Sequence, residues 1–307
     1  MRPLLVVLRE SEPLAKPLAE AVGAEIAHLE VRRFPDGETY LRYDTSPSGR
    51  PVVLLCPLDR PDDKFLPLLF AAAAARDLGA GSVGLVSPYL AYLRQDRRFR
   101  PGEAVTSTYF AEILARQVDW LVTVDPHLHR RSSLSEIYAK PAVALHAAPL
   151  IADWVREAID RPLLVGPDAE SEQWVAAVAR DAGAPHVVLR KTRRGDRDVE
   201  VSVPEVERWQ GHTPVLVDDI VSTARTMIET VGHLVRAGMR PPVCIAVHGL
   251  FAGDAYEELL QAGASRIVTS NTVTHETNAI DVTDLLADAV RKMIGEIGPG
   301  SNGPPGP

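Results

Sequence analysis

The sequence predicts an α/β protein built from mainly parallel sheets whose faces are covered by helices. Short apolar runs alternate with helical patterns along nearly the whole chain of 307 residues, and this alternation is typical of parallel sheets with crossover helices. Polar residues stand directly after several apolar runs, at the strand ends where open α/β sheets bind ligands. The length corresponds to about two domains at ~150 residues each. We therefore expect two tandem α/β domains with a boundary near residue 148.

Each predicted strand is a short run of aliphatic and β-branched residues. The predicted strands are Leu4–Leu8, Val52–Cys56, Val83–Val86, Leu121–Val124, Leu163–Val165, Val187–Leu189, Val215–Val217, Val243–Val247 and Ile267–Thr269. The predicted helices lie near residues 12–22, 64–78, 104–117, 147–159, 169–182, 223–237, 253–262 and 282–294. These elements divide into a first domain over 1–148 and a second over 149–297, an arrangement in which the last helix can pack back on the first domain.

Two further segments have patterns of their own. The run Val199–Val203 alternates apolar and polar residues, and it is expected to pair with Val187–Leu189 as a hairpin around Lys191–Asp198. Residues 298–307 contain almost only glycine and proline, and such a tail is expected to be disordered because it cannot bury an apolar core.

The composition argues against several classes of function. The formal net charge of −8 argues against nucleic acid as a partner, because phosphate backbones recruit basic protein faces. The two cysteines, Cys56 and Cys244, stand in separate apolar runs and are interpreted as buried small residues, not as a disulfide or metal site. The N-terminus has no signal-peptide pattern, and no apolar stretch reaches the ~18 residues of a membrane span. A soluble, cytoplasmic protein is expected.

The most informative segment is residues 214–226, Pro-Val-Leu-Val-Asp-Asp-Ile-Val-Ser-Thr-Ala-Arg-Thr. The strand predicted over Val215–Val217 ends in the adjacent carboxylates Asp218 and Asp219, and a Ser/Thr turn then opens a helical pattern. A helix N-terminus at this place offers backbone N–H groups and a partial positive charge to a phosphate. The paired carboxylates can hold a sugar diol or Mg²⁺. This turn therefore has groups for the phosphate, the hydroxyls and the metal of a sugar phosphate.

An arginine cluster follows the predicted strand Val83–Val86. Four arginines stand within residues 94–100, Arg-Gln-Asp-Arg-Arg-Phe-Arg, of an acidic protein. One interpretation is a solvated basic loop. A polyphosphate site is favoured, because planar guanidinium groups bind phosphate oxygens in pairs and the cluster follows the carboxyl end of a strand.

A second basic cluster covers residues 190–197, Arg-Lys-Thr-Arg-Arg-Gly-Asp-Arg. Its glycine and its charges are typical of a hairpin tip. It is interpreted either as a solvated loop or as a lid that closes cations over a reacting phosphate. A cation placed in that way is effective because it meets developing charge in a water-poor site.

Polar groups at other strand ends are open to two interpretations each. His127 follows Leu121–Val124 and is a candidate metal ligand without a zinc-like spacing. Asp168 follows Leu163–Val165 and either caps the next helix or binds a metal or its water shell.

Residues 32–38, Arg-Arg-Phe-Pro-Asp-Gly-Glu, have two interpretations. From this segment alone an exposed turn is favoured, and the alternative is a nucleotide contact with Phe34 against a base. Together the basic clusters and acidic strand ends favour a phosphate-handling Mg²⁺ site.

Several of these segments resemble one known family. Residues 87–103, Ser-Pro-Tyr-Leu-Ala-Tyr-Leu-Arg-Gln-Asp-Arg-Arg-Phe-Arg-Pro-Gly-Glu, are similar to the ATP-binding stretch of ribose-phosphate diphosphokinases (PRPP synthetases). Residues 34–38 resemble the adenine-contacting segment of that family, and residues 217–223 resemble its ribose-phosphate loop. The segment Lys191-Thr192-Arg193 resembles its catalytic flexible loop, in the form of the archaeal-type members. The resemblance runs in order over roughly residues 4–290.

The resemblance implies a duplicated phosphoribosyltransferase-type (type I) fold with the active site between the two domains, in a homodimer or higher homo-oligomer. It implies transfer of the diphosphoryl group of ATP to the C1 hydroxyl of ribose 5-phosphate, which gives 5-phosphoribosyl 1-diphosphate and AMP. Such a transfer needs positioning and charge neutralisation more than a protein nucleophile. The sequence agrees with this, because it has no Gly-x-Ser-x-Gly pattern and no Cys-His spacing typical of a nucleophile.

The resemblance also implies roles for single residues, carried over position by position. ATP would be bound by Phe34, Asp36, Glu38, Arg94, Gln95, Asp96 and Arg97. The transferring phosphates would be stabilised by two catalytic residues, Lys191 and Arg193, and Mg²⁺ would be served by His127 and Asp168. Ribose 5-phosphate would be bound by Asp218, Asp219, Ser222, Thr223, Ala224, Arg225 and Thr226.

Two positions depart from the pattern of the family. Arg225 stands where the family usually has glycine, which permits φ > 0 and a close approach of backbone to phosphate, so Arg225 either blocks that approach or adds a cation to it. The turn after Asp168 reads Ala-Glu-Ser-Glu over residues 169–172, where the family favours a small or glycine-containing turn. Two alternatives therefore stay open: a related diphosphokinase with a different sugar-phosphate acceptor, and a non-catalytic nucleotide-binding homologue.

Overall fold

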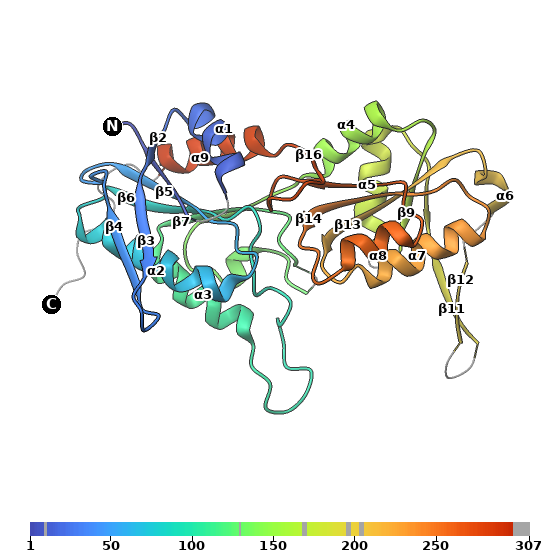
Figure 1. The fold of residues 1–307 in the computed structure, drawn as a ribbon, viewed down its shortest axis with the longest axis horizontal. Helices are drawn as coiled ribbons and strands as arrows, with labels where there is room; N and C mark the ends of the chain where they lie inside the picture. The colour runs from blue at the N-terminus through green and yellow to red at the C-terminus, as the bar shows by residue number, and fades with distance from the viewer. Residues whose placement is uncertain (9–10, 129, 168–170, 195–197, 203–205, 297–307) are drawn as a thin grey trace. The chain divides into compact units, whose positions relative to one another are not determined.

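The computed structural model describes residues 1–8, 11–128, 130–167, 171–194, 198–202 and 206–296 (Figure 1). The chain divides into two compact units, Met1–Leu145 with Thr283–Pro307 and His146–Val282. Each unit contains a parallel sheet flanked by helices, as the sequence predicts. Within the described residues, no helix is both long and apolar enough to cross a membrane. The predicted tail over 298–307 falls outside these residues.

The sheet of the first unit has the strand order β2-β1-β5-β6-β7-β8, with all pairs parallel. Its strands are β1 (Leu4–Val7), β2 (Glu25–Ala27), β5 (Pro51–Leu55), β6 (Ser82–Val86), β7 (Trp120–Val124) and β8 (Ala142–Leu145). Its helices are α1 (Glu12–Val22), α2 (Pro61–Asp77), α3 (Thr106–Gln117), the 3-10 helix η1 (Leu134–Glu136) and α9 (Thr283–Glu296). Helix α9 packs on α1, β7 and β8, whereas α2 contacts β5, β6 and α3, and Figure 1 shows the two groups on opposite faces of the sheet.

The sheet of the second unit has the order β10-β9-β13-β14-β15-β16, also parallel throughout. Its strands are β9 (Pro162–Gly166), β10 (His186–Val188), β13 (Thr213–Val221), β14 (Val243–Gly249), β15 (Arg266–Ser270) and β16 (Asn278–Ile280). Its helices are α4 (Ala148–Ala158), α5 (Glu172–Ala182), α6 (Val206–Trp209), α7 (Arg225–Arg236) and α8 (Ala255–Gln261). The two sheets therefore have the same strand order, which the sequence alone does not reveal because the two halves have little visible similarity.

An antiparallel hairpin is inserted at the same place in both units, directly after the second strand of the sheet. In the first unit it consists of β3 (Leu29–Arg33) and β4 (Thr39–Tyr43), and in the second of β11 (Arg190–Arg194) and β12 (Asp198–Ser202). The sequence predicted the second hairpin with the wrong partner strand. Residues Val187 and Val188 pair in parallel with β9, and the basic segment Arg190–Arg194 pairs with Asp198–Ser202 instead.

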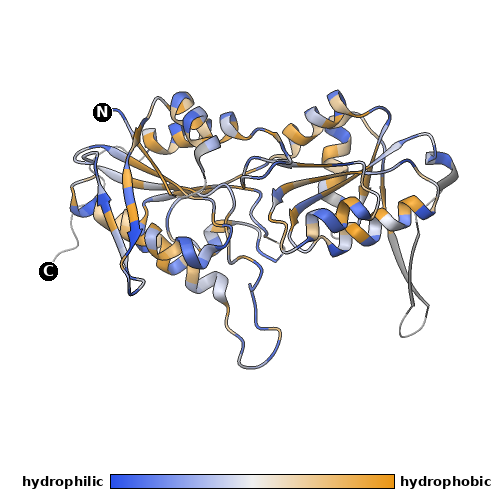
Figure 2. Cartoon of the chain, in the orientation of Figure 1, coloured by the Kyte–Doolittle hydropathy of each residue, from blue (hydrophilic) through white to orange (hydrophobic). Residues whose placement is uncertain are grey.

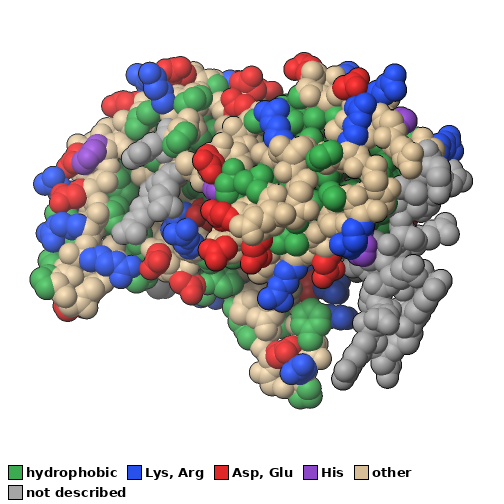
Figure 3. All heavy atoms as spheres, turned by 45° about the vertical axis from the view of Figure 1, so that its right-hand side comes forward, with side chains coloured by type: hydrophobic (Ala, Val, Ile, Leu, Met, Phe, Trp, Pro, Cys, Tyr) green, Lys and Arg blue, Asp and Glu red, His purple; other side chains and the backbone are tan. Residues whose placement is uncertain are grey.

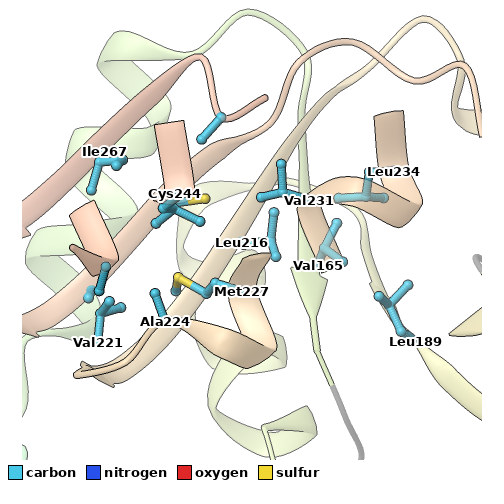
Figure 4. Packing of buried hydrophobic residues seen from close by; sticks show 14 of the residues in the cluster. Val165, Leu189, Leu216, Val221, Ala224, Met227, Val231, Leu234, Cys244 and Ile267 are labelled. Carbon is cyan, nitrogen blue, oxygen red and sulfur yellow. The ribbon is translucent and has the colours of Figure 1, made fainter. Parts of the chain in front are cut away.

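The central strands form the cores of both units because their side chains are buried on both faces. Every residue of β6 and β7 is buried, and Figure 2 shows hydrophobic residues concentrated in the central strands. In the second unit a cluster of sheet residues packs under α7 and α8, with Leu216 and Cys244 from the sheet against Val231 and Leu234 from α7 (Figure 4). Charged side chains of both signs are interspersed on the face shown in Figure 3.

The predicted helices agree with the observed ones within three residues at either end. The strands missed by the sequence, such as β3, β4 and β8, consist largely of half-exposed residues. A half-exposed strand of three to five residues lacks the continuous apolar run by which a buried parallel strand is recognised.

Gly84 gives a direct test of how tightly the first sheet is packed. Gly84 in β6 lies beside Trp120 in β7, and a Cβ atom built on Gly84 would lie 2.0 Å from the Trp120 ring. We predict that Gly84→Ala lowers the free energy of unfolding by about 1–3 kcal/mol, as overpacking of a rigid core does. Urea denaturation measures the change.

The matched control is Gly232→Ala in helix α7, where the new methyl meets only the flexible end of the Arg236 side chain at 3.1 Å. That change should stabilise the protein by up to about 1 kcal/mol, because alanine is the better helix former. Equal effects of the two substitutions would contradict the packing described for Gly84.

The two cysteines are predicted to be inert in the folded protein. Burial raises the pKa of both thiols, Cys56 and Cys244, to about 12, so at pH 8 they stay protonated and shielded from reagents. Labelling with a thiol-specific chromogenic disulfide should be negligible in buffer and reach both thiols in denaturant. Rapid labelling of either thiol in the native protein would show that its strand is not buried.

Candidate functional site

The paired carboxylates lie at the carboxyl end of β13, where parallel sheets bind ligands. The pairing of β13 with β9 reaches Leu216, opposite Val165, whereas the pairing with β14 continues to Val221, opposite Gly249. The strand predicted over Val215–Val217 is therefore too short, because the two aspartates are part of the strand and do not end it. Asp218 and Asp219 are half-buried, and the Asp218 Oδ1 atom accepts a hydrogen bond of 2.9 Å from the Asp219 amide.

The turn after β13 presents backbone donors at the start of α7. Among the described residues, the amides of Thr223, Arg225 and Thr226 have no backbone acceptor, as is usual for the first turn of a helix. The first turn of α7 contains no acidic residue. Thr223, Arg225 and Thr226 are exposed, so the turn offers hydroxyl, amide and guanidinium donors to an anion.

The left-handed residue of this turn is Ala224 and not Arg225. Ala224 has φ 54° and ψ 6° and precedes α7, which begins at Arg225. Its methyl group is buried in the core near Val221 and Met227 (Figure 4). Arg225 therefore has no left-handed backbone that would require glycine, and among the described residues its exposed guanidinium has no ion-pair partner.

The equivalent turn of the first unit has the opposite electrostatic character. It follows β5, the third strand of that sheet as β13 is of the other, and Arg60 at its end also has a left-handed backbone, with φ 49°. The first turn of α2 carries Asp62 and Asp63, which repel a phosphate. The buried Lys64 ammonium donates to Asp59 Oδ1 at 2.6 Å and to the Pro57 carbonyl at 3.1 Å. Of these two related turns, the one in the second unit suits a phosphate.

The arginine-rich segment of the first unit follows β6 and is fixed by side chains around it. Its exposed members are Arg94, Arg97, Arg98 and Arg100. Glu103 closes the turn, since its Oε2 atom accepts hydrogen bonds from the amides of Phe99 and Arg100 at 2.7 and 3.0 Å. The Gln95 side chain accepts a hydrogen bond of 3.1 Å from the Thr106 hydroxyl at the start of α3.

Two arginines in the loop after β7, neither of them among the predicted site residues, contact this segment. Arg130 contacts both carboxylate oxygens of Asp96 at 3.2 Å. Arg131 donates to the Asp96 carbonyl at 3.4 Å and to the Ser107 hydroxyl at 3.2 Å. The Asp96 carboxylate is therefore paired within the protein. The only sequence signal for this role is the position of the two arginines shortly after a strand end.

The guanidinium groups of this region also surround an exposed aromatic ring. Arg97 and Arg130 lie 4.8 and 5.4 Å from the centre of the Phe99 ring. Such cation–π contacts hold cations in place while leaving their outer edges available to a ligand. The predicted residues Arg94, Gln95, Asp96 and Arg97 thus belong to one braced, positively charged segment.

The predicted adenine contacts lie together at the tip of the β3–β4 hairpin. The Phe34 amide bonds to the Glu38 carbonyl at 2.8 Å, and the Glu38 amide donates to Asp36 Oδ1 at 3.2 Å. The Phe34 ring is exposed, and the Arg32 guanidinium lies 4.9 Å from its centre. Among the described residues, no hydrogen bond or ion pair joins this tip to the Arg94–Arg97 segment.

The predicted metal and catalytic residues are described only in part. His127 is half-buried in the loop after β7, two residues beyond the buried Asp125, whose φ is 33°. Asp168 falls outside the described residues. Lys191 and Arg193 lie on β11, opposite Val201 and Val199 of β12. In the part of the chain that is described, no group of three or more His, Cys, Asp or Glu side chains could hold a metal ion by itself.

Strained backbone marks the strand ends in both units. Among the described residues, six non-glycine residues have a left-handed backbone. Arg60, Tyr92, Asp125, Ala224 and Phe251 follow the central strands β5, β6, β7, β13 and β14, whereas Arg161 precedes β9. Such conformations cost about 1–3 kcal/mol each and cluster at functional sites. These left-handed residues cannot be predicted from the sequence, because only glycine reliably signals a positive φ.

Comparisons with known proteins agree with this geometry. A family model described as the N-terminal domain of ribose phosphate pyrophosphokinase matches residues 4–117, and a model of the phosphoribosyl transferase domain matches residues 133–285. A crystal structure of phosphoribosylpyrophosphate synthetase from Mycobacterium smegmatis has a TM-score of 0.83, 23% identity and coverage of 96% of this chain and 100% of that chain. This likeness confirms the fold that the resemblance implied.

Curated relatives extend the similarity over nearly the whole chain. The ribose-phosphate pyrophosphokinase of Sulfurisphaera tokodaii is 31% identical over 282 residues, which cover 90% of this chain and 95% of that protein. The protein of the same name from Thermoplasma acidophilum is 32% identical, with coverage of 93% and 98%, and that from Methanopyrus kandleri is 32% identical, with coverage of 95% and 100%. Because this identity spans both units, the chain belongs to the ribose-phosphate pyrophosphokinase family.

Proposed function

We propose that the protein transfers the diphosphoryl group of ATP to the C1 hydroxyl of ribose 5-phosphate, giving 5-phosphoribosyl 1-diphosphate and AMP. The observation that carries the proposal is the turn of the second unit, where two carboxylates, a Ser/Thr turn and a helix N-terminus follow one strand. The names of the family's curated members support it. In this reaction the C1 oxygen forms a bond to the β-phosphorus, and the bond to the α-phosphate oxygen breaks as AMP leaves.

The turn of the second unit is proposed to bind ribose 5-phosphate. The amides of Ser222, Thr223, Arg225 and Thr226 and the Ser222 and Thr223 hydroxyls would hold the 5-phosphate, because amides at a helix N-terminus are preorganised for an anion. Asp218 and Asp219 would accept hydrogen bonds from the ribose hydroxyls. Each carboxylate–hydroxyl bond of this kind is charge-assisted and is therefore stronger than a neutral one.

ATP is proposed to bind at the arginine-rich segment and hairpin tip of the first unit. The exposed Arg94 and Arg97 would meet the phosphates, and the exposed Phe34 ring offers an aromatic face to adenine. Asp36 and Glu38 would accept hydrogen bonds from the adenine amino group or the ribose. The Arg130–Asp96 pair fixes the segment before ATP arrives, which reduces the entropy lost on binding.

The residues present fit Mg²⁺ that enters with the nucleotide. Mg²⁺ keeps several waters and binds through one or two carboxylates together with substrate phosphates, so it needs no dedicated cluster of ligands. Asp168 and the Asp218–Asp219 pair carry the oxygen donors that it prefers, and His127 is suited to contact a metal-bound water. When bound, Mg²⁺ neutralises phosphate charge and thereby makes the β-phosphorus more open to attack.

The chain is proposed to act by positioning and charge, without a covalent intermediate. Both cysteine thiols are buried and protonated at neutral pH, since burial raises each pKa to about 12. Lys191 and Arg193 would stabilise the charge that develops on the transferring phosphates and on AMP. A cation that acts on the transition state raises kcat, because it binds the transition state more strongly than the ground state.

The first prediction of this proposal concerns turnover. Incubation with ATP, Mg²⁺ and ribose 5-phosphate should release AMP, and Lys191→Ala should lower kcat by about 10²–10³-fold while the KM for ATP changes little. A coupled AMP assay measures both. The control is Lys140→Ala, which removes an exposed cation from a loop of the first unit and should leave kcat unchanged. Release of ADP instead of AMP would contradict diphosphoryl transfer.

The second prediction concerns the acceptor. Arg225→Ala should raise the KM for ribose 5-phosphate by about 10-fold, the value of one charge-assisted hydrogen bond, and leave the KM for ATP unchanged. Arg236→Ala, at the opposite end of α7, is the matched control and should change neither KM.

A second assay tests the alternative that the acceptor is a different sugar phosphate, which Arg225 motivates. Among a panel of sugar phosphates, ribose 5-phosphate should give the highest kcat/KM. If another sugar phosphate is better, and Arg225→Ala abolishes that preference, the alternative acceptor is correct. ATP binding without any turnover would identify a non-catalytic homologue.

A further inference from the structure

The turn over residues 222–224, where the 5-phosphate is proposed to bind, is hydrogen-bonded on one side to the loop that follows β14. The amides of Leu250 and Phe251 both donate to the Val221 carbonyl, at 2.9 and 3.1 Å, and the Ala252 amide donates to the Ser222 carbonyl at 3.0 Å. These bonds fix the two peptide planes that lead into the turn. They are made entirely by backbone groups, so no side-chain motif reveals them.

The direction of these bonds determines where the turn amides point. In a trans peptide the C=O and the following N–H point in opposite directions, and the described chain has no cis peptide. Because the Val221 and Ser222 carbonyls point at the loop over residues 250–252, the amides of Ser222 and Thr223 point away from it. The loop over residues 250–252 therefore orients the Ser222 and Thr223 amides toward the side on which the phosphate is proposed to bind.

The loop over residues 250–252 is fixed in place by the packing of the Phe251 ring. Phe251 has a left-handed backbone with φ 40°, which is unfavourable for a bulky residue. Its ring packs on the His275 ring with centroids 4.5 Å apart and on the Tyr256 ring at 5.6 Å. A Cβ atom on Gly249 would lie 2.7 Å from the ring, so the ring lies over the glycine. Aromatic packing thus offsets the backbone strain.

His275 is a rigid support because the turn between β15 and β16 fixes it. Its Nδ1 atom lies 2.9 Å from the Thr277 hydroxyl, and its amide donates to the Asn278 side chain at 3.0 Å. Asn278 in turn donates to the Thr269 hydroxyl and to the Ser270 carbonyl, at 2.8 and 2.7 Å. Partial burial lowers the pKa of His275, which keeps the ring neutral at pH 7 and suited to stacking.

We propose that Phe251 is a positioning residue for ribose 5-phosphate, which acts by locking the loop over residues 250–252 that aims the Ser222 and Thr223 amides. Phe251 does not touch the substrate in this account. The inference rests on the proposed function of the turn and adds a residue from a different loop, together with its supports His275, Tyr256 and Gly249. Loss of the ring frees the loop and lets the two amides turn away from the phosphate.

The test separates the two substrates. Phe251→Ala should raise the KM for ribose 5-phosphate by about 10-fold to 100-fold, because hydrogen bonds from the two amides to the charged phosphate are weakened, while the KM for ATP stays within about twofold. Phe251→Tyr keeps the ring and should retain a nearly wild-type KM. Leu260→Ala removes an exposed side chain from α8 in the same unit and is the matched control.

A second variant tests the same idea with Phe251 in place. Gly249→Ala places a methyl group 2.7 Å from the Phe251 ring and 2.8 Å from the Cγ2 atom of the buried Thr269. Displacement of the ring should raise the KM for ribose 5-phosphate in the same way, and the φ of Gly249 is compatible with alanine. Calorimetric titration of each variant with ribose 5-phosphate alone gives a readout that does not need turnover. If Phe251→Ala does not fold, the affinity of Gly249→Ala for ribose 5-phosphate tests the proposal.

The outcomes distinguish this inference from the proposed function. A wild-type protein that releases no AMP with ribose 5-phosphate overturns the proposed function itself. An active wild type combined with an unchanged ribose 5-phosphate KM in folded Phe251→Ala, or with equal increases for both substrates, overturns only the positioning role. An increase confined to ribose 5-phosphate and absent from Phe251→Tyr supports it.

Discussion

The pairing of β13 with β14 beyond Asp218 is the interaction on which the proposed phosphate site depends. It keeps the two carboxylates within β13, which pairs with β14 at Asp218 and again at Ile220 and Val221, so their backbone is held by the sheet and not by a flexible loop. It also brings the Val221 and Ser222 carbonyls within reach of the loop after β14. The hydrogen bonds on one side of the turn are thus taken by protein, and the donors on the other side remain for an anion. A site on such a rigid element loses little entropy when the substrate binds.

The two units show how one scaffold can present different chemistry at equivalent places. Both have the same strand order, an inserted hairpin and a left-handed residue before the helix that follows the third strand. In the first unit that turn is occupied by an internal ion pair between Lys64 and Asp59, and its helix begins with acidic residues. In the second unit the equivalent helix begins with Arg225. The two turns share their place in the fold and a left-handed residue before the helix, but they differ in length and in the charge of their side chains.

The sequence predicts the buried parts of this structure well and the contacts between loops poorly. Strands such as β6 and β7 are recognisable because burial on both faces demands continuous apolar runs. The end of β13 is mispredicted because two aspartates normally end a strand, whereas here pairing with β14 overrides that preference. The roles of Arg130 and Phe251 are not predictable from the sequence for another reason, since they depend on contacts with residues far away in the chain. The left-handed Ala224 is hidden because alanine does not signal a positive φ.

The most direct test of the central claim follows the β-phosphate of ATP. With ATP labelled at the β-phosphorus, Mg²⁺ and ribose 5-phosphate, we predict that all transferred label appears in the sugar product, with unlabelled AMP as the other product. This result requires that the bond between the β-phosphorus and the α-phosphate oxygen is cleaved. ATP labelled at the γ-phosphorus must then place its label in the same sugar product, because both phosphates move together. Label retained in ADP, with only one phosphoryl group added to ribose 5-phosphate, would contradict diphosphoryl transfer.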